Sequence, residues 1–203
     1  MYPFGVERED WNRRWQERAP HVRDDPSDVL AAELGETPPG RALDLACGAG
    51  RNALWLAERG WQVTGVDFSD TALALARRAA RERGVDVDWV QADVRSYRPE
   101  PAAYDLVVVL FLHLPPAQRR ELLARAAAAL APGGRMLVLG HDVDNLGTGA
   151  PGPSDRSVLY APETVARELD GLEVEKAERV VRQVEGEGGP VQAIDTLVVA
   201  RRR

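Results

Sequence analysis

A glycine-rich turn preceded by an acidic residue is the segment of this sequence best suited to holding a ligand. The run DLACGAGRNALWL, residues 44–56, places Gly48 and Gly50 between an apolar segment and a helical pattern. A phosphate-binding P-loop would follow its glycines with a Lys-Ser/Thr pair, and Arg51-Asn52 is not such a pair. The spacing G-x-G-x-x-A fits a dinucleotide site loosely. Asp44, however, stands where dinucleotide sites are normally apolar, and it suits a ligand with a cationic end.

Two more acids end the next two apolar segments. Asp67 ends WQVTGVD and Asp93 ends DVDWVQAD, and both segments are predicted strands. Ligands of open parallel sheets bind outside the carboxyl ends of the strands. Three acids at three successive strand ends are therefore a more specific pattern than the glycines, although Asp67 and Asp93 could also be ordinary turn residues.

The elements that would position these acids alternate from residue 41 onward. Short apolar runs predict strands, long alanine-rich or capped stretches predict helices, and residues 145–157 predict a loop rich in Gly, Pro, Ser and Asp. After a short helix between Pro162 and Gly171, two strand-like segments flank the turn EGEGGP and predict a hairpin. This order predicts a mostly parallel sheet with helices on both faces. The predicted strands are 41–46, 61–67, 86–93, 104–112 and 135–142, the predicted helices are 52–60, 69–84 and 116–131, and the hairpin segments are 172–184 and 191–203.

The stretch ALDLACGAGRNALWLAERGWQVTGVDFS resembles the first two strands of class I S-adenosylmethionine-dependent methyltransferases. The resemblance runs from about Arg41 to the end of the chain and implies one methyltransferase domain over residues 41–203. The implied fold is α/β, with a Rossmann-like, seven-stranded, mostly parallel sheet that ends in an antiparallel hairpin. The implied reaction converts S-adenosylmethionine into S-adenosylhomocysteine and requires no metal.

The same resemblance implies the roles of the acids. The glycines let the backbone approach the cofactor, and Asp44 lies near its amino-acid end. Asp67 accepts hydrogen bonds from the ribose hydroxyls, Phe68 packs on the adenine, and Asp93 meets the adenine amino group. The residues expected around the cofactor are Asp44, Ala46, Gly48, Gly50, Arg51, Asn52, Asp67, Phe68, Ala92, Asp93, Val94, Leu110 and Phe111.

Candidate catalytic residues lie in the segments that should face the methyl acceptor. The turn FLHLPP lacks the Asn/Asp-Pro-Pro-aromatic motif of enzymes that methylate exocyclic base nitrogens, which argues against DNA or RNA adenine methylation. His113 in this turn could act as a base or polariser, or it could cap a helix or pack. His141 is a second candidate base. The His141-Asp142 pair could suggest a metal or a base with its orienting acid, but adjacent strand residues point to opposite faces.

Trp11 and Trp15 are four residues apart in DWNRRW and share one face of a predicted helix. They form either a packing stripe or part of a lid. The thiopurine methyltransferase family has a similar W-x-x-x-W segment and a tryptophan in the helix after the glycine turn, as Trp55 is here. Tellurite-resistance-type methyltransferases share this short layout, and GHDVDNLGTGAPGPSDRSVLYAPETV is similar to actinobacterial class I members. These resemblances imply that residues 1–40 form a helical lid and favour a thiol, selenium or tellurium acceptor.

Composition narrows the remaining function classes. The net charge is −6 and Lys176 is the only lysine, so a nucleic-acid partner is not expected. Cys47 is the single cysteine, and neither a signal peptide nor a membrane span is recognisable. We expect a cytoplasmic monomer or homodimer that acts on a small molecule without a membrane partner. The alternatives are a non-catalytic S-adenosylmethionine-binding scaffold and an NAD-linked oxidoreductase, which would need a Tyr-x-x-x-Lys or similar dyad.

Overall fold

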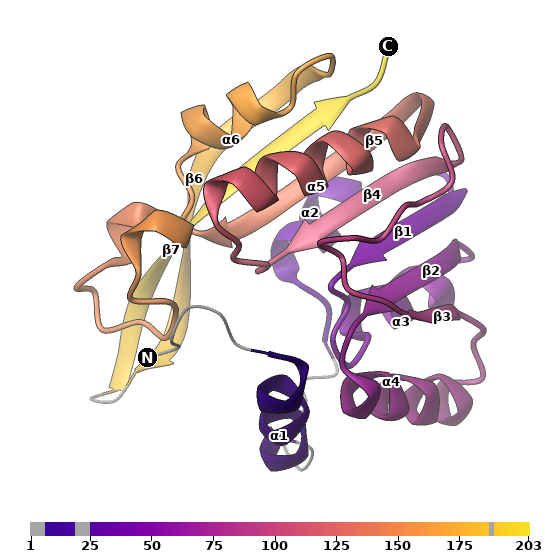
Figure 1. Ribbon diagram of the computed structural model, residues 1–203, viewed down its shortest axis with the longest axis horizontal. Helices are drawn as coiled ribbons and strands as arrows, with labels where there is room; N and C mark the ends of the chain where they lie inside the picture. Colours follow the sequence, from indigo (N-terminus) through magenta and orange to yellow (C-terminus); the bar gives the residue numbers. More distant parts are fainter. Residues whose placement is uncertain (1–6, 19–24, 187–188) are drawn as a thin grey trace.

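A computed structural model describes residues 7–18, 25–186 and 189–203 of the chain. Within these residues seven strands form one sheet in the order β3-β2-β1-β4-β5-β7-β6 (Figure 1). Strands β1 to β5 run parallel, whereas β7 runs antiparallel to both β5 and β6. The predicted Rossmann-like sheet with its antiparallel hairpin is thus confirmed. The strands are β1 (Arg41–Leu45), β2 (Gln62–Asp67), β3 (Asp88–Gln91), β4 (Tyr104–Leu110), β5 (Leu130–His141), β6 (Glu173–Gly186) and β7 (Gly189–Arg201).

Helices cover both faces of the sheet, as the alternating pattern predicts. On one face α2 and α3 pack through apolar side chains such as Leu30 and Leu56. On the other face α5 and α6 pack through Leu123 and Val165, and both helices lie in front of the sheet in Figure 1. The helices are α1 (Arg8–Arg18), α2 (Asp28–Leu34), α3 (Arg51–Glu58), α4 (Asp70–Arg83), α5 (Pro116–Ala129) and α6 (Pro162–Glu168), with the short 3₁₀ turns η2 (Val143–Asn145) and η3 (Arg156–Val158).

The boundary between α5 and β5 differs from the prediction. The helix was expected to continue to Pro132, but it ends at Ala129 and Leu130 already begins β5. Leu130 has extended backbone angles, is fully buried and pairs with Tyr104. Burial of this leucine between sheet and helix decides the boundary against the helical propensity of the alanine run.

The two N-terminal helices lie in different places. Helix α1 lies beside α4 below the carboxyl ends of the strands in Figure 1, and Asn12 bonds with Ser69 at the start of α4. Helix α2 was expected at the same edge, but its Leu30 and Leu34 are buried on a face of the sheet beside Trp61. That expectation was wrong for α2, because its two leucines cover apolar surface that the edge does not offer. None of the helices in the described ranges has the length and apolar character needed to cross a membrane.

Candidate active site

The backbone at the carboxyl ends of β1 and β4 is held in an unusual conformation. Ala46, directly after β1, has a φ of 64°, and Phe111, directly after β4, has a φ of 55°. Non-glycine residues seldom adopt this left-handed conformation, and those that do cluster at functional sites. Ala102 is the other described non-glycine residue with positive φ. Because β1 and β4 are neighbours in the sheet, the two strand-end residues mark one edge as the candidate site.

The glycine turn joins β1 to α3. Gly48 and Gly50 have φ values of 57° and 85°, and the Gly50 N–H donates to the Cys47 carbonyl over 3.0 Å. Helix α3 then begins at Arg51. At Gly48 and Gly50 the turn therefore has backbone without side chains, as expected of a segment that a ligand approaches closely.

Asp44 is a buried acid with one free oxygen. Its neighbours Leu43 and Leu45 face the α5 side of the sheet, so alternation directs Asp44 toward α3. Its side chain is 1% exposed, and Oδ2 has no hydrogen-bond partner among the described residues. Burial, together with the charge of Asp67, raises the pKa of Asp44 to about 7. A buried carboxylate oxygen without a donor fits the cationic amino group of S-adenosylmethionine.

Asp67 ends β2 directly beside the turn. The Gly48 N–H donates to its Oδ2 and the Ser69 N–H to its Oδ1, each over 2.9 Å. Burial raises the pKa of Asp67 against the opposing effect of these backbone bonds. A carboxylate has about four acceptor positions, so these backbone bonds orient the group and leave it able to accept from a ligand hydroxyl.

Asp93 has a partner that the sequence analysis missed. Arg95 lies two residues later, and its Nη2 is 2.6 Å from Asp93 Oδ2. Partial burial acts to raise the pKa of Asp93, but the hydrogen bonds and charge of Arg95 outweigh it and lower that pKa. The expected adenine contact at Asp93 would thus be made by a carboxylate that Arg95 already orients.

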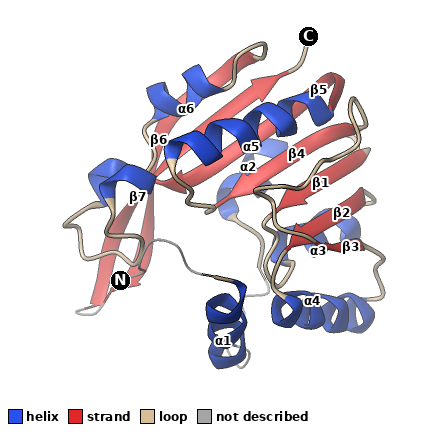
Figure 2. Ribbon diagram, in the orientation of Figure 1, coloured by secondary structure: helices blue, strands red, loops and turns tan. Residues whose placement is uncertain are grey.

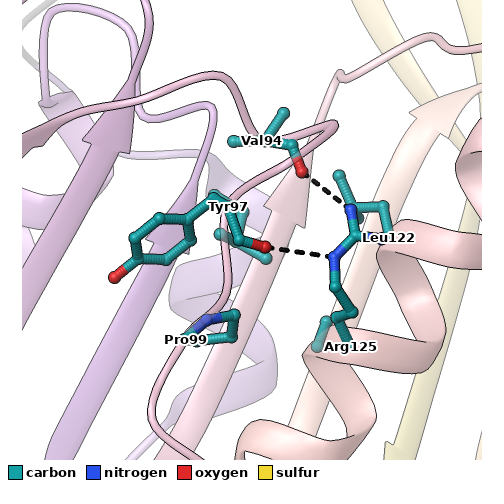
Figure 3. Close-up of a pocket in the computed structure, with 7 residues that line it drawn as sticks. Val94, Tyr97, Pro99, Leu122 and Arg125 are labelled. Atoms are coloured by element: carbon teal, nitrogen blue, oxygen red, sulfur yellow. Dashed lines mark hydrogen bonds between the residues drawn. The ribbon is translucent and has the colours of Figure 1, made fainter.

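Arg125 of α5 holds the loop that follows Asp93. Its guanidinium donates to the carbonyls of Val94 and Tyr97 over 3.0 and 3.1 Å, as Figure 3 shows. A third bond reaches the Arg95 carbonyl over 2.9 Å. Leu122 of the same helix and Pro99 line the shallow recess beside this contact. Arg125 therefore holds the backbone of the loop that contains Asp93 and Arg95.

Replacing Arg125 with methionine is expected to lower the unfolding free energy by about 1–2 kcal/mol, because three carbonyls lose a charged donor in a partly exposed setting. We also expect the affinity for S-adenosylhomocysteine to fall several-fold, since Asp93 loses its support. Urea denaturation and calorimetry check the two effects. Arg120→Met, on an exposed face of α5, is the matched control and should change neither; equal effects of both substitutions would contradict the prediction.

Helix α1 brings Trp15 to the glycine turn. A Cβ atom at Gly48 would lie 2.7 Å from Cζ2 of the Trp15 ring, so only glycine permits this approach. Trp11 instead packs under the Arg14 guanidinium, 5.1 Å from its ring centroid. The two tryptophans thus have different surroundings, and Trp15 is the one at the candidate site.

His113 uses both of its ring nitrogens within the protein. Nδ1 lies 3.1 Å from the Val158 carbonyl and Nε2 lies 3.4 Å from the backbone nitrogen of His141. Burial and the neighbouring His141 lower the pKa of His113 to about 4. His113 is therefore neutral and donates from Nδ1 while Nε2 accepts.

His141 and Asp142 do point to opposite faces, as expected for adjacent strand residues. His141 Nδ1 lies 2.9 Å from Oδ1 of Asp195 in β7, an acid that the sequence analysis missed. Asp142 instead accepts from Arg179 over 3.0 Å and from the Thr196 hydroxyl. Three or more potential metal ligands do not gather anywhere in the part of the chain that the structure describes.

Many of the expected residues fall into two spatial groups. Asp44, Gly48, Gly50, Asp67 and Trp15 meet at the ends of β1 and β2, whereas Phe111, His113 and His141 meet at the ends of β4 and β5, with ring centroids 5.2 Å apart in successive pairs. Other members of the expected set have structural contacts. Asn52 accepts from the Ser27 N–H over 2.9 Å, and Val94 and Leu110 belong to the two apolar cores.

Comparison with known proteins shows that part of the chain is similar to methyltransferases. Residues 42–134 match the family model described as a methyltransferase domain. The chain is 42% identical over 106 residues to a demethylmenaquinone methyltransferase of Thermus thermophilus, a match covering 51% of this chain and 48% of that protein. The chain spans about half the length of the curated relatives it matches. These relatives also include ribosomal RNA methyltransferases.

Solved structures share the fold at low sequence identity. TehB from Haemophilus influenzae superposes with a TM-score of 0.72 at 18% identity, over 97% of this chain and 67% of that one. The [4+2]-cyclase SpnF superposes with a TM-score of 0.70 at 17% identity, over 98% and 97% of the two chains. The comparisons support the class I resemblance and do not single out the tellurite-resistance or thiopurine group. Residues 42–134 thus match a methyltransferase domain, and the described residues form a seven-stranded Rossmann-like fold.

Proposed function

We propose that the chain binds S-adenosylmethionine at the carboxyl ends of β1 and β2 and transfers its methyl group to a small-molecule acceptor. The observation that carries the proposal is the free carboxylate oxygen of Asp44, which is buried next to the turn that contains Gly48 and Gly50. A phosphate or pyrophosphate ligand would be repelled by this acid, whereas an ammonium group complements it.

The residues at the edge have distinct roles in this proposal. Asp44 receives the amino group, Asp67 the ribose hydroxyls, Phe68 the adenine ring and Asp93 the adenine amino group. S-adenosylmethionine supplies an activated methyl group, so the protein chiefly aligns the acceptor and excludes water. The lid predicted for residues 1–40 reduces in this proposal to helix α1, which brings Trp15 over the glycine turn.

The acceptor lies beyond the end of β4, next to Phe111, His113 and His141. Its restriction to a thiol, selenium or tellurium species rests on the family resemblance only. The matched relatives include enzymes named for both small-molecule and RNA substrates. The net charge of −6 favours a small molecule over RNA.

Two other functions remain as rivals. A scaffold that binds S-adenosylmethionine without transfer is compatible with the same acids, and SpnF illustrates that this fold is not confined to proteins named methyltransferases. An NAD-linked oxidoreductase fits less well, because Asp44 occupies the strand position that such sites keep apolar and Lys176 lies on β6, away from the glycine turn.

Calorimetry with S-adenosylhomocysteine and with NAD tests the proposal. We expect binding of the former and none of the latter. Turnover of S-adenosylmethionine is then measured with phenols, thiols, selenite, tellurite and amines. Tighter binding of NAD would contradict the proposal, and cofactor binding without turnover of any acceptor would favour the scaffold.

A further inference from the structure

A histidine and a fully buried acid are paired at the acceptor end of the sheet. His141 ends β5, and Asp195 is its direct partner in the antiparallel ladder with β7. His141 Nδ1 lies 2.9 Å from Asp195 Oδ1, and the Asp195 side chain is 0% exposed whereas that of His141 is 15% exposed. Asp195 is thus buried, and of the two side chains only the His141 imidazole is accessible from the site.

Other groups around the pair keep Asp195 ionised. Arg182 of β6 donates from Nε to the second oxygen of Asp195, and its guanidinium lies 5.2 Å from the Phe111 ring centroid. Burial acts to raise the pKa of Asp195, but the bonds from His141 and Arg182 outweigh it and lower that pKa. The remaining titratable neighbour, His113, stacks on His141 with centroids 5.2 Å apart and is neutral.

The arrangement fixes which nitrogen of His141 is free. An ionised carboxylate can only accept, so the proton of a neutral His141 resides on Nδ1 and the lone pair on Nε2. Nε2 has no hydrogen-bond partner among residues 7–18, 25–186 and 189–203. Gly152 lies between η2 and η3 in the β5–α6 connection, whose helical turns Figure 2 draws in blue and whose other segments it draws in tan. A Cβ at Gly152 would lie 3.0 Å from Cδ2 and 3.4 Å from Nε2 of His141. A side chain at residue 152 would therefore crowd the His141 ring, and glycine avoids this contact.

We infer that His141 is the general base of the acceptor site, that Asp195 is the residue that positions it, and that the acceptor is a hydroxyl compound such as a phenol or enol. This inference rests on the proposed function. In the step, the acceptor oxygen forms a bond to the methyl carbon while the carbon–sulfur bond breaks and its electron pair goes to sulfur. The hydroxyl proton passes to His141 Nε2, and the carboxylate of Asp195 stabilises the resulting imidazolium.

The His141–Asp195 pair favours a hydroxyl acceptor over a thiol or selenol acceptor. A thiol is present to about a few per cent as a strongly nucleophilic thiolate near neutral pH and needs no base, whereas a phenol or alcohol is almost entirely protonated and needs one. A buried acid that fixes the tautomer of a partly exposed histidine has a chemical use only if a proton must be removed. Phe111, partly exposed next to His141, offers a ring face to an aromatic acceptor.

The test compares Asp195→Asn with Asp142→Asn. Both substitutions remove a fully buried carboxylate that contacts an arginine, but only Asp195 contacts His141. In Asp195→Asn, Arg182 is expected to attract the amide oxygen and turn the amide NH₂ toward His141 Nδ1. That orientation moves the imidazole proton to Nε2 and blocks the base.

Nitrogen-15 NMR of the imidazole rings, assigned with His141→Gln, reports the tautomer without any cofactor. We expect Nδ1–H in the wild type and in Asp142→Asn, and Nε2–H in Asp195→Asn. Turnover is measured with phenols, catechols and hydroxyquinolines beside the corresponding aryl thiols. Asp195→Asn should lower hydroxyl methylation by roughly 10²-fold or more, change thiol methylation little, and leave S-adenosylhomocysteine affinity unchanged.

Several outcomes would overturn the inference. These are an Nε2–H tautomer in the wild type, methylation of thiols only, no methylation of any acceptor despite cofactor binding, and equal losses in the two variants. Failure to bind S-adenosylhomocysteine while the tautomer is as expected would instead refute the proposed function, and the acceptor assignment with it.

Discussion

Replacing Asp67 with alanine is expected to weaken S-adenosylhomocysteine binding by roughly 10²-fold or more. The carboxylate would accept two hydrogen bonds from ribose hydroxyls, and bonds to a charged group contribute about 1.5–3 kcal/mol each. The substitution also removes the acceptor of the Gly48 and Ser69 N–H groups, so the glycine turn loses its anchor to β2. Isothermal titration calorimetry measures the affinity.

The control separates loss of binding from loss of folding. Asp88 is an exposed acid at the opposite, amino end of the neighbouring strand β3, and Asp88→Ala should leave the affinity unchanged. Circular dichroism and thermal melting show whether Asp67→Ala is folded, and Asp67→Asn retains the size of the side chain without its charge. A folded Asp67→Ala protein that binds as tightly as the wild type would contradict the role of Asp67.

Replacing Asp44 with asparagine is expected to stabilise the free protein above neutral pH and to weaken cofactor binding. Burial raises the pKa of Asp44 from 3.8 to about 7. Between these two values the folded state holds a proton that the unfolded state has released, so stability falls as the pH rises from about 4 to about 7 and then stays level. The loss of unfolding free energy over this pH range is at most roughly 4 kcal/mol, at about 1.4 kcal/mol for each unit by which the folded and unfolded pKa values differ. Asparagine has no charge to bury and avoids this cost.

Urea denaturation at pH 4 and pH 8 measures the effect on stability. The variant should match the wild type at pH 4 and exceed it at pH 8. Between pH 5 and pH 7, binding of S-adenosylhomocysteine to the wild type should release a proton, because its amino group favours the ionised form of Asp44. Calorimetry in two buffers of different ionisation enthalpy detects this release. The variant should release none and bind at least about tenfold more weakly. Equal stability at pH 8 together with unchanged affinity would refute the assignment.

The architecture was accessible from the sequence because it follows from local patterns. Continuous apolar runs such as 104–112 mark strands covered on both faces, and the caps at Ser69 and Gly84 mark the ends of a helix. Errors arose where tertiary burial outweighs local preference. Leu130 leaves the alanine-rich helix because the sheet buries it, and α2 covers an apolar face because Leu30 and Leu34 have no other place to be buried.

By itself the sequence determined where the acids of the cofactor edge lie. Asp44 and Asp67 stand at the ends of consecutive parallel strands, and the ends of such strands meet at one edge whatever the details of packing. The pairing of His141 with Asp195 was decided only by the tertiary structure. The two residues are 54 positions apart, and the register of the antiparallel β5–β7 ladder brings them opposite each other. A slip of one residue would have turned Asp195 to the other face, and no local pattern specifies that register.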